Sequence, residues 1–116
     1  MALSVTAYTG TQLVSTTKWS LTTATAGPDI DTNIGVYEAY LDVSAVAFGD
    51  EFLFEIWEKA RAADTQRVTY SATIKDAQTD AIFKSPAMLL GAGWDMTVIK
   101  VAGTDRTITW SVRKVS

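Results

Sequence analysis

WDMTVIKV at residues 94–101 and RTITWSVRKV at residues 106–115 are the two stretches that decide the fold class of this sequence. In the second stretch, the large apolar residues Ile108, Trp110 and Val112 alternate with polar ones. Alternation with a period of two is typical of a strand that buries one face. The AGTD segment between the two stretches is suited to a turn. We therefore predict a terminal hairpin in which Ile108, Trp110 and Val112 face the core.

The same alternation appears in residues 36–43 and 67–74, and residues 87–90 are expected to form a short buried strand. Residues 48–50 form a predicted turn, and residues 77–86 are expected to be irregular. The side chains expected to face the core are Tyr37, Ala39, Leu41, Val43, Val68, Tyr70, Ala72 and Ile74. The pattern predicts an all-β fold, a single antiparallel β-sandwich or jelly-roll-like barrel of about 7–8 strands. Residues 1–116 are expected to form one domain.

Residues 51–63 fit two secondary structures. As a helix, they place Phe52, Ile56 and Ala60 on one apolar stripe with glutamates opposite. As a strand, they place Phe52, Phe54 and Ile56 on one face. We expect a strand through about Lys59, because aromatic and β-branched residues favour strands and the flanking chain is strand-like.

The N-terminal segment is almost free of charge. Between residues 1 and 28 the only charged side chain is Lys18. Residues 3–8 and 13–23 are predicted to be two strands joined at Thr9 and Gly10. Residues 1–25 are therefore expected to be either an edge hairpin of this domain or an N-terminal arm that lies on a neighbouring subunit.

Composition excludes several classes of function. The chain of 116 residues has a formal net charge of −3 and neither cysteine nor histidine. The scattered Lys and Arg residues do not form the basic surface of a nucleic-acid-binding protein. Disulfides, thiol catalysis and the usual zinc sites need residues that are missing. With no apolar stretch near 20 residues and no signal-peptide pattern, we expect a soluble protein made in a cytoplasm, without a membrane partner.

Two groups of oxygen-bearing residues are candidate chemical sites. DIDTNIG at residues 29–35 spaces its oxygens as a calcium loop does, but Ile34 and Tyr40 stand where an EF-hand needs Gly and a bidentate Glu. Five carboxylates could supply an acid–base pair, but their alternation with apolar residues is more typical of a solvated face. These carboxylates are Glu38, Asp42, Glu51, Glu55 and Glu58. We expect no catalytic residue, no metal and no cofactor, and hence no enzyme.

The tryptophans are the most informative side chains for binding. Trp19 and Trp110 lie on apolar faces and are expected in the core. Trp57 and Trp94 are also expected in the core, but they are better candidates for exposure than Trp19 and Trp110. An exposed aromatic ring can anchor a protein interface or stack on a sugar. The candidate interface residues are Trp57, Trp94, Tyr8 and Leu13.

Several segments together resemble a group of small proteins encoded by tailed bacteriophages, often near virion structural genes. The segments are AGPD (26–29), GVYEAYLDVSA (35–45), FGDEF (48–52), WEKAR (57–61), DTQRV (64–68) and GWDMTVIKVAGTDRTITWSVRKV (93–115). The likeness covers nearly the whole chain beyond the first 25 residues and implies no catalytic residue.

The resemblance implies a virion protein. The small, acidic, β-rich chain fits a capsid decoration (cement) protein that binds the phage major capsid protein on the capsid surface after synthesis in the host cytoplasm. It would be a homo-oligomer, with a trimer expected. The alternatives are a tail or head–tail connection component, or a carbohydrate-binding β-sandwich module.

Overall fold

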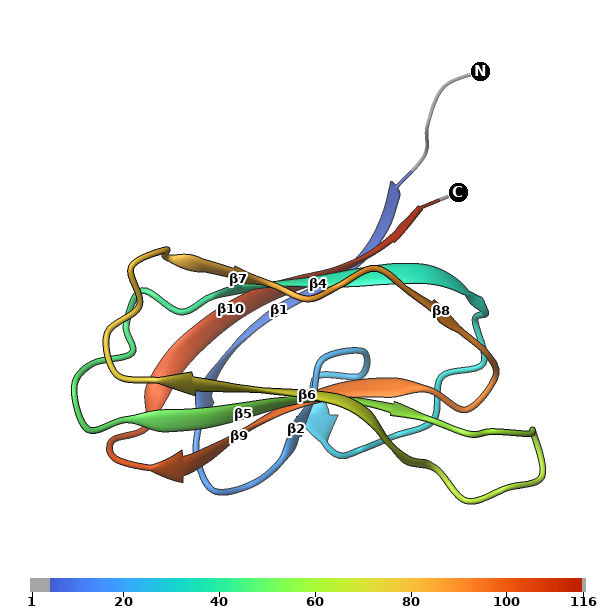
Figure 1. Ribbon diagram of the computed structural model, residues 1–116, viewed down its shortest axis with the longest axis horizontal. Coiled ribbons are helices and arrows are strands. Elements are labelled where there is room, and N and C mark those ends of the chain that lie inside the picture. Colours follow the sequence, from blue (N-terminus) through green and yellow to red (C-terminus); the bar gives the residue numbers. More distant parts are fainter. Residues whose placement is uncertain (1–4, 116) are drawn as a thin grey trace.

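The computed structural model describes residues 5–115, which fold into two antiparallel β-sheets packed face to face (Figure 1). The strands are β1 (Val5–Val14), β2 (Trp19–Ser20), β3 (Thr25–Ala26), β4 (Gly35–Asp42), β5 (Glu51–Glu58), β6 (Arg67–Lys75), β7 (Ile82–Lys84), β8 (Met88–Leu90), β9 (Asp95–Ala102) and β10 (Arg106–Val115). Sheet A has the order β1-β10-β4-β7, with β8 also paired to β4, and sheet B has the order β3-β2-β9-β5-β6. The predicted all-β sandwich is confirmed, but with ten strands instead of seven or eight.

The core lies between the two sheets and follows the predicted alternation in most strands. In β4, Tyr37, Ala39 and Leu41 are fully buried. Residues 51–58 form a strand and not a helix, and Phe52, Phe54 and Ile56 face inward with no exposed surface. Ile108, Trp110 and Val112 are buried as predicted.

The predicted terminal hairpin is wrong. β9 pairs with β2 and β5 in sheet B, whereas β10 pairs with β1 and β4 in sheet A. The loop after β9 therefore crosses from one sheet to the other. Gly103 has a φ of 87° in this loop. It lies so close to Asp50 and to the carbonyl of Gly49 that a Cβ there would clash.

The predicted N-terminal hairpin is also wrong. β1 runs without interruption through Thr9 and Gly10, paired with β10 from Val5↔Val115 to Val14↔Arg106. Gly10 lies opposite Trp110, and a Cβ at Gly10 would stand 2.5 Å from Cζ2 of the indole. The glycine therefore makes room for a ring instead of forming a turn.

Two local predictions need smaller corrections. The register between β5 and β6 shifts at Thr69, so that Ile56 pairs with Tyr70 but Trp57 pairs with Val68. This β-bulge turns Val68 to the outer face, where it is 42% exposed instead of buried. In addition, the segment expected to be irregular contains β7, which pairs with β4.

Candidate interaction surface

The two sheets have lateral edges that differ in how they are protected against pairing with another chain. Exposed strand edges invite such pairing unless they are short, charged, bulged or interrupted by proline. β3 has two residues, while β7 and β8 have three each and are separated by Pro86. β6 is longer, but it carries Arg67 and Lys75 at its ends and the bulge at Thr69.

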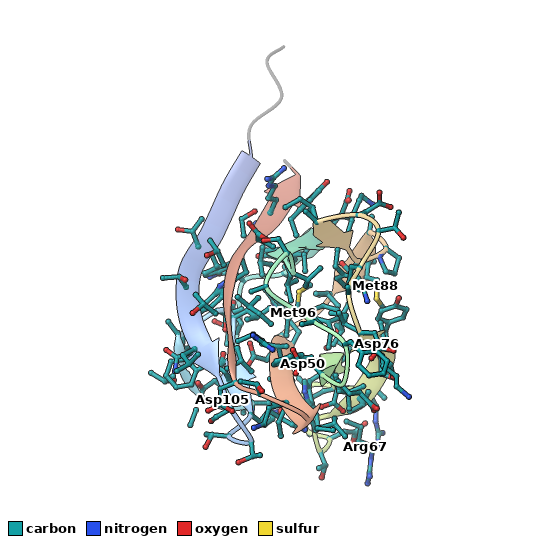
Figure 2. All side chains as sticks on the ribbon, turned by 90° about the vertical axis from the view of Figure 1, so that its left-hand side faces the viewer. Asp50, Arg67, Asp76, Met88, Met96 and Asp105 are labelled. Carbon is teal, nitrogen blue, oxygen red and sulfur yellow. The ribbon has the colours of Figure 1, made fainter. Side chains whose placement is uncertain are left out.

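β1 is the long edge that lacks these protections. Its ten residues, VTAYTGTQLV, contain no charge and no proline, and its pairing with β10 shows no register shift. On its other side, no strand within residues 5–115 pairs with it. β1 lies along the lateral boundary of the molecule in Figure 2. Its outward backbone groups can therefore accept another strand.

The outer face of sheet A is also uncharged around Thr9 and Thr11. Thr9 and Thr11 are exposed there, and the hydroxyl of Thr109 on β10 donates to that of Thr11 over 3.0 Å. The nearest charged group on this face is Arg113 of β10, which pairs with Ala7 of β1 and whose guanidinium lies 3.9 Å from the centre of the Tyr40 ring. On the strands beyond β10, Lys84 forms a 2.7 Å ion pair with Glu38.

Leu13 and Tyr8, two of the candidate interface residues, both lie on β1 but on opposite faces. Leu13 is 55% exposed. Tyr8 is half-buried and packs against the core, and its hydroxyl accepts a 2.9 Å hydrogen bond from Nδ2 of Asn33. Burial raises the pKa of Tyr8. Of the two, Leu13 is the side chain that a partner could contact.

The core position favoured for Trp94 is confirmed, and its alternative role as an exposed interface residue is wrong. The side chain is fully buried, with its ring centre 4.3 Å from that of Tyr37, and its Nε1 donates to the carbonyl of Asn33. Tyr37 donates its hydroxyl to the same carbonyl, and burial raises the pKa of Tyr37 to about 12. These aromatic rings close one end of the core, so Trp94 is not available to a partner.

Trp57 is half-buried on the outer face of sheet B. Its Nε1 donates to Oγ1 of Thr97 over 2.9 Å. Lys18 Nζ lies 4.5 Å from the ring centre and 2.7 Å from Oε1 of Glu55. Because Lys18 covers a face of the ring, that face is not free to stack on a sugar.

In the loop at residues 27–34, side-chain oxygens accept hydrogen bonds that fix the conformation of the loop. Asp29 accepts hydrogen bonds from the hydroxyls of Thr23 and Thr25, and Asp31 accepts one from the amide of Asn33. The buried carboxylate of Asp95 accepts the amide of Asp29, and burial raises the pKa of Asp95. Within residues 5–115, no three carboxylates gather as a metal site would require.

The five carboxylates that could supply an acid–base pair lie on different sheets. Glu38 and Asp42 belong to β4 in sheet A, whereas Glu51, Glu55 and Glu58 belong to β5 in sheet B. Glu58 accepts the amide of Gly91 over 2.6 Å, and Asp42 accepts the amide and hydroxyl of Ser44. Their contacts tie loops and neighbouring strands together.

The sequence did not predict the exposure of two large apolar side chains. Residues 88–90 form a strand, but Leu89, which was expected to be buried, is 79% exposed. Phe48, in the turn between β4 and β5, is 90% exposed. The sequence marked residues 48–50 only as a turn. A large aromatic residue beside a turn glycine was the signal that could have identified it.

Comparisons with protein-family models, with curated proteins and with solved structures find no match to this chain. The described residues contain no helix long and apolar enough to cross a bilayer.

Proposed function

We propose that this protein is a non-enzymatic virion structural protein of a tailed phage, a capsid decoration protein that attaches to the assembled shell through the β1 edge. The observation that carries the proposal is the unprotected edge of β1, which has ten uncharged residues and one unpaired side among the described strands. The phage context comes from the sequence resemblance.

Strand addition suits this edge. An extended segment of a neighbouring chain that lies along β1 gains main-chain hydrogen bonds over its whole length. It meets no like charge and no bulge on β1, and the Thr9 and Thr11 hydroxyls beside the edge are able to pair across strands. Sheet A would then continue into the partner.

The proposed partner is the phage major capsid protein, and the decorating unit is a homo-oligomer, with a trimer expected. A protein that binds the assembled lattice more tightly than its free subunits stabilises the lattice by mass action. The location is the capsid surface of the virion, after synthesis in the host cytoplasm. The rival location is the tail or the head–tail connection.

The position of the protein in purified particles tests the proposal directly. Virions of the encoding phage are labelled with an antibody to the protein and imaged by electron microscopy. Many copies over the head support decoration. A ring of label at the tail would contradict decoration and support the tail role. Absence from the particles would contradict both roles.

Substitutions test the part played by β1. Thr9→Lys with Thr11→Lys places two charges on the edge strand and should weaken attachment to shells that lack the protein. The matched control is Thr107→Lys with Thr109→Lys on β10, which adds the same charges to the same face one strand away from the edge. Both double variants lose the Thr11–Thr109 hydrogen bond, so this loss does not distinguish them. Equal attachment by the two variants would show that β1 is not the contact.

A further inference from the structure

Phe48 and a small uncharged pocket on the same chain are complementary in size. We infer that Phe48 of one copy inserts into the pocket at the end of β1 of a second copy, which is how the proposed homo-oligomer forms. This inference rests on the oligomeric part of the proposed function and does not involve the unpaired backbone edge of β1.

The backbone of the turn that carries Phe48 is fixed by hydrogen bonds, whereas the ring of Phe48 is exposed. The amide of Ala47 donates to Oδ2 of Asp50, and the amide of Asp50 donates back to the carbonyl of Ala47 over 3.0 Å. The next amide along from Phe48, that of Gly49, donates to Oδ1 of Asp76. Val46 anchors the turn in the core. Because the backbone of the turn is already fixed, only the side chain of Phe48 loses conformational freedom on binding, which favours a role as an interface anchor.

The pocket lies where β1 ends and the chain turns toward β2. It has a volume of about 140 Å³ and is lined by Gln12, Leu13, Val14, Ser15, Thr17 and Trp19, none of them charged. A protein cavity of about 150 Å³ can hold a benzene ring. The pocket is therefore large enough for the ring of a phenylalanine, and Leu13 supplies an exposed apolar rim.

The charges near Phe48 favour a protein partner over a lipid surface. Asp76 accepts a hydrogen bond from the turn, and Glu51 follows the turn in sequence. Neither carboxylate forms an ion pair within the described residues. Anionic membranes attract basic segments and repel acidic ones. A second copy offers a pocket without negative charge, whereas an anionic bilayer would repel this acidic chain of net charge −3.

The turn and the pocket lie toward the same end of the sandwich. Val14, which lines the pocket, pairs with Arg106, and Arg106 bonds to Asp50 beside the turn. Because ring and pocket are different surfaces, copies can join reciprocally about a two-fold axis or head to tail in a closed ring, as the expected trimer requires.

Sedimentation equilibrium of the purified full-length chain tests the inference. The parent should be a closed oligomer, and Phe48→Ser should raise its dissociation constant about 30-fold or more, as truncation of an interface anchor does. Leu89→Ser is the matched control, because it removes another exposed apolar side chain, 79% exposed, from β8 and should change nothing. A monomeric parent, or equal effects of the two variants, would overturn the inference.

A second pair of variants examines the pocket. Thr17→Arg should fill it and weaken association as Phe48→Ser does, whereas Thr16→Arg adds the same charge at an exposed residue outside the pocket. Mixing the Phe48→Ser and Thr17→Arg variants should restore a one-to-one heterodimer, because one supplies the ring and the other the open pocket. Failure of this mixture to associate would contradict the inference. Shells that do not bind an oligomeric parent would instead contradict only the capsid role.

Discussion

Gly10 of β1 lies directly opposite Trp110 of β10, and the six-membered ring of the indole fills the space that a side chain at Gly10 would need. The edge strand is thereby fitted to the largest side chain of its neighbour. Trp110 is 3% exposed, and its Nε1 donates to the carbonyl of Leu21 over 2.8 Å. The contact joins the edge strand, the core and the chain beyond β2.

Gly10→Ala should destabilise the fold by about 1–3 kcal/mol, the usual cost of forcing extra volume into a packed site. The added Cβ would lie 2.5 Å from Cζ2 of Trp110, so the ring or the strand must shift. Urea unfolding followed by fluorescence measures the change. Thr9→Ala, at an exposed neighbouring position, is the control. Similar midpoints for both variants would mean that β1 does not pack on Trp110 as described.

Trp110→Ala should cost ~3–5 kcal/mol, as truncation of a large buried aromatic side chain does. The variant loses the packing of the ring in the core and leaves the carbonyl of Leu21 without its indole donor. Thermal melting is the measurement. A variant that melts like the parent would place Trp110 on the surface and reverse the faces of β10.

The sequence was sufficient for the faces of most strands but not for their partners. In β10, apolar alternation identified the buried face formed by Ile108, Trp110 and Val112. Two strands that face each other across a core show the same alternation as two strands of one hairpin, so the pattern could not distinguish them. The choice depends on the loop around Gly103, whose contacts with Asp50 and Gly49 come from a distant part of the chain.

The wrong face predicted for Val68 and the interface role left open for Trp94 have related causes. The bulge at Thr69 adds one residue to β6, so Arg67 and Val68, which precede it, lie on the opposite faces from those that the alternation predicts. Trp94 follows a glycine-rich turn, which suggested exposure. It is buried because Asn33, about sixty residues earlier, supplies the acceptor for its Nε1. Neither relationship is visible in a local pattern.

The candidate interaction surface was predictable only in part. The lack of charge in the first 28 residues pointed to β1, because a solvated strand normally carries charges. That β1 is one uninterrupted edge depends on the pairing of Gly10 with Trp110. The pocket at Leu13 and the exposure of Phe48 depend on how distant segments meet, which the sequence alone does not give.

Calcium and chelators should leave the melting temperature unchanged. In the loop at residues 27–34, Asp29 is engaged by two threonine hydroxyls and Asp31 by the amide of Asn33. A cation would have to displace these donors. Differential scanning fluorimetry with calcium and with EDTA provides the measurement. A rise of several degrees with calcium, equivalent to about 1 kcal/mol for a domain of this size, would contradict the prediction.

Asp50 should make the fold sensitive to acid. The backbone amides of Thr104 and Ala47 and the guanidinium of Arg106 donate to its carboxylate, and these bonds lower the pKa of Asp50 from 3.8 to about 2. A carboxyl group whose pKa is lower in the folded chain than in the unfolded one stabilises the fold above its unfolded pKa. This contribution is lost as the pH falls toward the folded pKa.

The melting temperature should therefore fall between about pH 4 and pH 2, the window set by the lowered pKa of Asp50. Asp50→Asn should melt lower than the parent at neutral pH, because Arg106 then faces a neutral amide, and its melting temperature should change less through the acid window. Asp42→Asn is the matched control. Hydrogen bonds from Ser44 also lower the pKa of Asp42, but less than that of Asp50, so this variant should retain most of the acid response of the parent. An unchanged acid response in Asp50→Asn would show that other carboxyl groups control unfolding at low pH.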